Sequence, residues 1–182
     1  MDDTAAISSA ILGLISGIGA GVLALVFARS AAHKLAEFEF FSATLGEYRL
    51  LPALFVGPVA VSLTAAEVVA IALLIVPDTR AIGAAMAVFL LSLYAFAMAV
   101  NLHRGRFKID CGCGGPGQMI SWALVVRNLT LAVAAAFVAV YAAAFDTIRA
   151  ATPVAFAAVL LCWLLLAIVD QIIGNRAHAR AM

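Results

Sequence analysis

The chain has 182 residues, of which 66% are hydrophobic and only 12% carry a charge, and its formal net charge is +1. In soluble domains about half of the residues are apolar and about a quarter are charged, so this composition excludes a soluble globular domain. A near-neutral chain without a run of basic residues also gives no indication of nucleic-acid binding. The expected class is therefore an all-α integral membrane protein embedded in a lipid bilayer.

Five apolar stretches predict transmembrane helices, because each is close to the ~20 residues that cross a bilayer. They cover residues 6–28, 53–76, 82–102, 120–145 and 154–173. After the first stretch, Arg29 and His33-Lys34 are expected to mark the water interface. We predict a single membrane domain over residues 1–182. In it, the first four helices form an antiparallel transmembrane four-helix bundle, to which the fifth is added.

The segment of residues 34–51 is too polar to cross a membrane. It mixes aromatic residues such as Phe38 and Phe41 with charged residues such as Glu39. Amphipathic segments of this kind lie at the membrane surface, with their aromatic rings among the lipid headgroups. The segment is either a plain connecting helix or a lid over the mouth of the bundle, beside a second polar loop at residues 103–119.

The predicted helices contain five polar or charged residues at membrane depth: Glu67, Tyr94, Arg127, Asn128 and Asp170. At 1.5 Å per residue, these residues fall in the half of the bundle beneath the loop of residues 103–119. An unpaired charge at this depth is costly, so we predict an ion pair between Glu67 and Arg127. The pair either fixes the helix register, or belongs to a polar pocket that supplies protons or binds a redox-active head group.

The loop of residues 103–119, called the Cys loop below, contains Cys111 and Cys113. It also carries three cationic side chains close to this pair: Arg104, Arg106 and Lys108. Cations and a following helix N-terminus lower the pKa of a thiol, and the thiolate is the form that attacks a disulfide. Gly112 permits the bend of a small Cys-Gly-Cys ring, and a strained disulfide is more oxidising. We therefore predict a reversible dithiol/disulfide at Cys111 and Cys113.

Two other interpretations of the Cys loop stay open. In the first, His103, Asp110, Cys111 and Cys113 supply four metal ligands. Structural zinc sites usually have two pairs of cysteines two to four residues apart, and a soft ion such as Cu(I) would suit this pair better. In the second, the two cysteines are unrelated small residues in a glycine-rich turn. Cys162, in the middle of the last predicted helix, is expected to serve packing.

Short motifs along the chain match a family pattern. They are Phe27, His33-Lys34, residues 48–52 (YRLLP), Glu67, residues 101–106 (NLHRGR), residues 109–114 (IDCGCG), residues 120–122 (ISW) and Arg127-Asn128. Together these motifs resemble the MauE family of methylamine-utilisation proteins, within the wider MauE/DoxX group of small redox-associated membrane proteins. The resemblance implies a role in the maturation (disulfide formation, processing or export) of the small (beta) subunit of methylamine dehydrogenase. It also implies a thioredoxin-like partner, MauD.

The position of the cysteines before the fourth predicted helix is also similar to the four-helix bundle of vitamin K epoxide reductases. That family uses Cys-x-x-Cys to react with a quinone. This chain has Cys-x-Cys and no second cysteine pair after its first helix. A partner protein would therefore supply the shuttle pair, and a quinone cofactor stays open. Also open is whether the chain is a thiol-disulfide oxidoreductase or a non-catalytic assembly or transport factor for the subunit.

Two arguments about the location of the Cys loop disagree. Eight Lys/Arg residues lie on the side that bears the loop: Arg29, Lys34, Arg49, Arg104, Arg106, Lys108, Arg176 and Arg180. The opposite side has Arg80 and Arg149, so the positive-inside rule predicts a cytoplasmic loop. Disulfides, however, persist in the periplasm, and the resemblance implies a periplasmic client. Because some of the basic residues can serve the thiols or the bundle mouth, we favour an inner-membrane protein with a periplasmic Cys loop.

Overall fold

The structure is a computed structural model that describes residues 2–112, 118–142 and 152–179. Its elements are α1 (Asp2–Ala36), α2 (Phe38–Glu47), α3 (Ala53–Ile75), the 3-10 helix η1 (Pro77–Thr79), α4 (Arg80–His103), α5 (Trp122–Tyr141) and α6 (Thr152–Ala179). Within these residues, β-type pairing is limited to one isolated bridge between Asp110 and Met119. The all-α class predicted from composition is therefore confirmed.

Five helices in the described part of the chain are long and apolar enough to cross a membrane. They are α1, α3, α4 together with η1, α5 and α6, whereas α2 has only 10 residues. Each also exposes large apolar side chains, such as Phe55 on α3 and Val133 on α5, and apolar surface on this scale is typical of helices that contact lipid. The chain is thus a multi-pass membrane protein.

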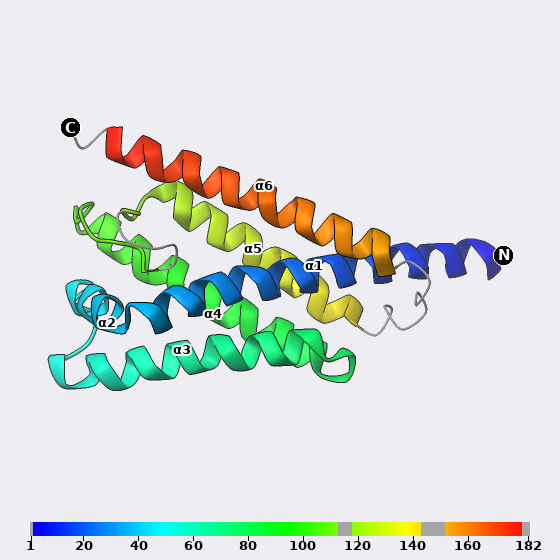
Figure 1. Cartoon of the computed structure of the whole chain (residues 1–182), viewed down its shortest axis with the longest axis horizontal. Helices are drawn as coiled ribbons and strands as arrows, with labels where there is room; N and C mark the ends of the chain where they lie inside the picture. Colours follow the sequence, from blue (N-terminus) through cyan, green and yellow to red (C-terminus); the bar gives the residue numbers. More distant parts are fainter. Residues whose placement is uncertain (1, 113–117, 143–151, 180–182) are drawn as a thin grey trace.

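The first helix is longer than its apolar stretch. α1 has 35 residues, which corresponds to about 50 Å and exceeds the ~30 Å hydrocarbon core of a bilayer. Figure 1 shows its N-terminal turns extending beyond the other helices. At its other end the helix continues past Arg29 as far as Ala36, and Lys34 is only 1% exposed. The expectation that Lys34 marks the water interface is therefore wrong.

The central helix of the bundle is α1, which contacts every other α-helix. α4 packs between α3 and α5, α6 packs against α1, and Figure 1 shows α6 at the edge of the molecule. No described side chain of α6 is fully buried. At Gly21 of α1, an added Cβ would approach the Val159 side chain to 2.8 Å, so this glycine allows α6 to pack closely.

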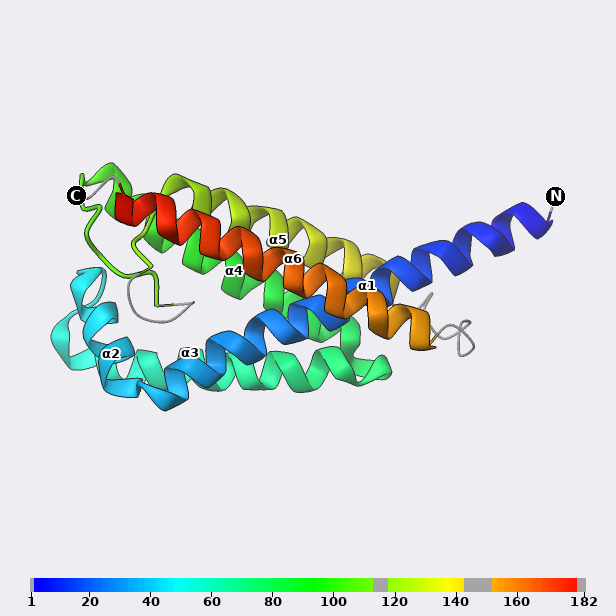
Figure 2. The same cartoon turned by 45° about the horizontal axis from the view of Figure 1, so that its top comes forward.

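Two clusters of buried side chains form the core. The first joins α1, α3, α4 and α5 through residues such as Phe27, Leu74 and Leu90. The second includes Met98 and Cys111 and lies beneath the Cys loop. In both Figure 1 and Figure 2, α2 and the described part of the Cys loop occupy the same end of the bundle. Cys111 is thus anchored in packed protein, at the end of the bundle that α2 covers.

Candidate functional site beneath the Cys loop

The two described arms of the Cys loop pair with each other. The Cys111 N–H donates to the Gln118 carbonyl at 2.8 Å, and the Ile120 N–H donates to the Ile109 carbonyl at 2.9 Å. The Cys111 thiol lies 3.3 Å from the Gln118 side-chain oxygen, and Cys111 is 8% exposed. Cys113 lies outside the described residues. The short ladder fixes the position of Cys111 relative to the bundle.

Position 112 requires a glycine for two reasons. Its φ of +70° lies in the left-handed region that residues with a Cβ rarely adopt. A Cβ at this position would also lie 3.3 Å from the Phe41 ring of α2. The Gly112 N–H donates to an Asp110 carboxylate oxygen at 3.1 Å, which stabilises the turn. The glycine therefore allows α2 to pack directly against the backbone that follows Cys111.

Basic residues of the Cys loop have different environments. Arg106 donates to the Asn101 side-chain oxygen at 3.1 Å and lies 3.5 Å from the Tyr48 carbonyl, so it ties the end of α2 to the end of α4. Arg104 and Lys108 are exposed. The N-terminus of α5 is capped by Ser121, whose hydroxyl accepts the Leu124 N–H. Arg106 thus has a structural role that the sequence did not indicate.

A buried polar cluster lies inside the bundle. The Lys34 ammonium of α1 is 2.5 Å from the Glu67 carboxylate of α3, and their side chains are 1% and 0% exposed. Tyr94 of α4 donates to the same carboxylate oxygen at 2.7 Å, and Ser30 donates to it at 3.1 Å. Lys34 also donates to the Tyr94 hydroxyl at 3.2 Å. We call these four residues the Lys34–Glu67 cluster.

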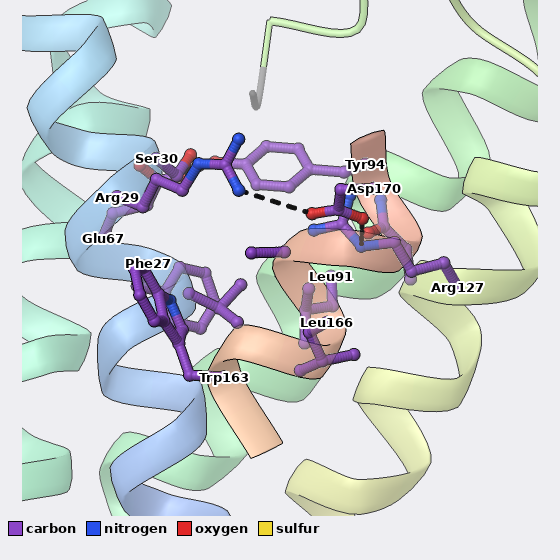
Figure 3. Close-up of a pocket in the computed structure, with 13 residues that line it drawn as sticks. Phe27, Arg29, Ser30, Glu67, Leu91, Tyr94, Arg127, Trp163, Leu166 and Asp170 are labelled. Carbon is purple, nitrogen blue, oxygen red and sulfur yellow. Dashed lines mark hydrogen bonds and ion pairs between the residues drawn. The ribbon is translucent and has the colours of Figure 1, made fainter. Parts of the chain in front are cut away.

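The ion pair predicted between Glu67 and Arg127 is wrong. Arg127 of α5 forms an ion pair with Asp170 of α6. Its Nε lies 3.1 Å from the Asp170 Oδ1, but the two atoms do not form a hydrogen bond. Arg29 of α1 lies 3.8 Å from the same carboxylate, as the dashed line in Figure 3 marks. Asp170 therefore joins α6 to α1 and α5, while Lys34 neutralises Glu67. Two separate networks replace the one that we expected.

Tyr94 of the cluster lines two cavities. The smaller, of about 30 Å³, lies between α1, α4, α5 and α6, and Figure 3 shows Tyr94, Arg127 and Asp170 around it. Glu67 and Asn128 also line it, and Glu67 Oε2 has no hydrogen-bond partner among the described residues. This cavity brings together all five polar residues that the sequence places at membrane depth.

The larger cavity, of about 200 Å³, lies between α2, α3, α4 and the Cys loop, and its surface is almost entirely apolar. Cys111 lies on its wall, as do Lys34 and Tyr94. Tyr94 lines both cavities and so separates one from the other. The structure thus brings the predicted residues Cys111 and Tyr94 to one enclosed space, with Glu67 immediately behind Tyr94.

Lys34 and Gln118 are the principal site residues that the sequence analysis missed. Lys34 continues the buried stripe of α1 that passes through Leu23, Phe27 and Ser30, at intervals of three and four residues. This helical spacing is a signal that could have revealed it. Gln118 follows residues 113–117, which lie outside the described part of the chain, and nothing in the local pattern indicates its contact with Cys111.

The proposed metal ligands do not assemble in the part of the chain that the structure describes. There, no three His, Cys, Asp or Glu side chains come together as a metal site requires. The His103 ring packs edge-on against Trp122 at 5.1 Å between ring centroids, and Asp110 accepts the Gly112 N–H. Both side chains therefore have other partners.

Fold and site together define a class: an all-α, multi-pass membrane protein with a buried Lys–Glu–Tyr cluster beneath a cysteine loop. A sequence model of the family described as "Methylamine utilisation protein MauE" matches residues 10–142. This match includes the Cys loop and every helix that forms the first core cluster. The chain belongs to the MauE family.

Curated relatives of the chain carry the same description. Methylamine utilization protein MauE of Paracoccus denitrificans is 40% identical over 111 residues, which cover 60% of each chain. The protein of that name from Methylophilus methylotrophus is 40% identical over 120 residues, or 64% of this chain and 63% of the relative. That of Methylorubrum extorquens is 37% identical over 115 residues, or 62% of each. The chain thus matches less than two thirds of these relatives' length, and no solved structure matches it.

Proposed function

We propose that this protein is an inner-membrane thiol/disulfide factor that supports maturation of the methylamine dehydrogenase small subunit, with the thioredoxin-like protein MauD as its partner. Membership of a methylamine-utilisation family is the context for this proposal. The observation that carries it is the position of Cys111 on the wall of an enclosed cavity that also contains Lys34 and Tyr94. Ionisable groups inside a membrane are costly and are usually retained for function.

In this proposal Cys111 and Cys113 form and break a disulfide in exchange with the partner. The chain has only three cysteines, and Cys162 lies exposed on α6, so the expectation that it serves core packing is wrong. The chain therefore has no second pair through which to shuttle equivalents, and a partner dithiol must do so. Disulfide exchange through a cysteine pair held by a helical bundle would be a feature in common with vitamin K epoxide reductases.

A periplasmic Cys loop belongs to the same proposal. Two of the eight basic residues on that side are used inside the bundle, because Lys34 binds Glu67 and Arg29 pairs with Asp170. The positive-inside rule concerns charges in loops, so these two residues do not count toward it. Six basic residues remain on the loop side, against Arg80 and Arg149 on the opposite side, and Arg80 is itself buried and donates to the Leu74 carbonyl, so the charge count still opposes a periplasmic loop. The periplasmic location is proposed because a disulfide persists there.

The proposal is tested by complementation in a methylamine-using bacterium that lacks its own family member. Cys111→Ser and Cys113→Ser are each expected to abolish accumulation of the mature dehydrogenase small subunit, whereas Cys162→Ser retains it. Immunoblots of the membrane fraction control for insertion of each variant. If both loop variants support full accumulation, the protein acts as a non-catalytic assembly factor and the redox proposal fails.

A further inference from the structure

We propose that the smaller cavity binds a water molecule, which hydrogen-bonds to Glu67, Arg127 and Asp170 and gives the buried Lys34–Glu67 cluster a route for proton exchange. Three properties of the cavity carry this proposal: buried polar atoms without hydrogen bonds, a volume that admits water, and a distribution of charge that favours a neutral ligand. The water site goes beyond the proposed thiol chemistry and does not depend on it.

Three buried side-chain atoms define the site. Glu67 Oε2, Arg127 Nε and Asp170 Oδ1 have no hydrogen-bond partner among the described residues, and all three side chains line the smaller cavity. Figure 3 shows Arg127 and Asp170 beside each other at this cavity. Buried polar atoms in proteins are nearly always hydrogen-bonded, either to protein or to ordered water. Three unsatisfied atoms around one space therefore indicate a ligand that satisfies them together.

A water molecule matches these atoms in number and in kind. Glu67 Oε2 and Asp170 Oδ1 are acceptors, and the Arg127 Nε–H is a donor. Water has two O–H donors and two lone pairs, so one molecule can donate to both carboxylates and accept from the guanidinium. Buried waters make about three hydrogen bonds each, and they need a space of about 10–15 Å³ or more. The cavity, at about 30 Å³, therefore has room for water.

The charges around the cavity disfavour an ion as its ligand. Arg29 lies 3.8 Å and Arg127 3.1 Å from the Asp170 carboxylate, and Lys34 neutralises Glu67. A cation in the cavity would meet the Arg127 guanidinium, whereas an anion would meet the carboxylates of Glu67 and Asp170. Repulsion between like charges is strong in a buried site, so a neutral molecule that both donates and accepts hydrogen bonds is favoured.

The two oxygens of the Glu67 carboxylate have different environments. Oε1 accepts hydrogen bonds from Lys34 and Tyr94, whereas Oε2 is the atom that we assign to the water. The water therefore joins the cluster to Asp170, which pairs with Arg29, and the Arg29 side chain is 28% exposed. Chains of carboxylates and water are the usual proton relays inside membrane proteins. Through this site the buried Glu67 exchanges protons with the partly exposed edge of the bundle.

Solid-state NMR tests the site through the carboxyl carbons of the glutamates. Full-length protein with 13C-labelled glutamate is placed in lipid bilayers, and magnetisation is transferred from water protons to these carbons. The chain has four glutamates, and Glu67→Gln identifies the Glu67 signal. Glu37, Glu39 and Glu47 are exposed and should receive magnetisation in every variant, which makes them the internal control. We expect wild-type Glu67 to receive it as well, although its side chain is 0% exposed.

Two variants of α6 separate cavity water from other sources of protons. Ala167 lines the cavity, whereas Ala157 is exposed on the same helix. Ala167→Leu extends into the cavity and should slow the transfer to Glu67 about fivefold or more, because the water is displaced. Ala157→Leu should leave the transfer unchanged. Leu166→Phe, with Leu165→Phe at an exposed position as its control, repeats the comparison should Ala167→Leu not fold.

Two results would overturn the water site. One is the absence of transfer to Glu67 in the wild-type protein while the three exposed glutamates receive it. The other is undiminished transfer to Glu67 in both cavity-filling variants. Protons would then reach Glu67 from the larger cavity through Tyr94, and the smaller cavity would not be the route.

Discussion

Lys34 of α1 and Glu67 of α3 form an ion pair in the interior of the bundle, with 2.5 Å between the ammonium nitrogen and one carboxylate oxygen. Both side chains are almost completely buried. Removing two charges from water costs several kcal/mol per ion, and the Tyr94 and Ser30 hydrogen bonds offset part of this cost. The pair therefore persists because each partner compensates the other.

The first prediction concerns this compensation. Lys34→Met alone, or Glu67→Leu alone, leaves one buried charge without its counterion and is expected to lower the free energy of unfolding by about 3–5 kcal/mol. The double variant should lose much less than the sum, because both charges are removed. Denaturant unfolding in a mild detergent measures all three.

A second cycle, with Arg127→Met in place of Lys34→Met, is the control. Arg127 pairs with Asp170 and shares with Glu67 only the lining of the smaller cavity, so its coupling to Glu67→Leu should be much smaller than that of Lys34→Met. Strong coupling in the Arg127 cycle, together with additivity in the Lys34 cycle, would mean that the two networks are paired differently.

Gly21 gives a prediction about the attachment of α6. Because an added Cβ would approach Val159 to 2.8 Å, Gly21→Ala is expected to lower the free energy of unfolding by about 1–3 kcal/mol through overpacking. Val159→Ala in the same protein should recover most of this loss. At Gly46 of α2 the nearest atom to an added Cβ is 4.0 Å away, so Gly46→Ala should instead stabilise the helix by about 0.5–1 kcal/mol. Equal effects at the two glycines would argue against close packing of α6.

Gly112 and Gly105 form a matched pair in the Cys loop. Both have positive φ, at +70° and +73°, but only Gly112 has a side chain, Phe41, close to the position of an added Cβ. Substitution by alanine costs about 1 kcal/mol at either site from backbone strain. Gly112→Ala should in addition displace α2 and reduce accumulation of the mature dehydrogenase subunit, whereas Gly105→Ala should retain it. A similar loss of accumulation in both variants would remove the α2 contact as the cause.

Gln118 provides a prediction about the accessibility of the thiol. Gln118→Leu removes the side-chain oxygen that lies 3.3 Å from the Cys111 sulfur. A hydrogen bond contributes about 1 kcal/mol, so alkylation of reduced Cys111 by a maleimide should become about fivefold faster. Gln171→Leu, at an exposed position of α6, is the control. An unchanged rate in Gln118→Leu would show that this contact does not hold the thiol.

Composition and the length of the apolar stretches predicted the helical class and the membrane helices, because lipid imposes the same requirement on every turn of a spanning helix. The depth of each residue in the predicted membrane helices also predicted that Glu67, Tyr94, Arg127 and Asn128 would lie close together. It could not predict which charges pair, because the rotation of each helix about its axis is decided by packing. Lys34 was assigned to the surface from its position after an apolar stretch, although its helical spacing from Phe27 and Ser30 placed it on the buried face.

The Cys loop was less predictable. Its ladder joins residues 109–111 to residues 118–120, and the contact of Gly112 with Phe41 joins positions about 70 residues apart in sequence. Such contacts depend on the tertiary structure and leave no local pattern. The chemical interpretation of Cys111 and Cys113 came from their spacing and their neighbours, and it stays a prediction that an experiment must decide.

The most direct test of the central claim is the redox state of this pair in cells. Thiols of growing cells are trapped with acid, free thiols are alkylated with a mass-shifting maleimide, and the membrane protein is resolved by electrophoresis, with Cys162→Ser as the background. We predict a mixture of the dithiol and disulfide forms of Cys111 and Cys113, which shifts toward one form when the thioredoxin-like partner is deleted. A pair that stays in a single redox state with and without the partner would contradict the account.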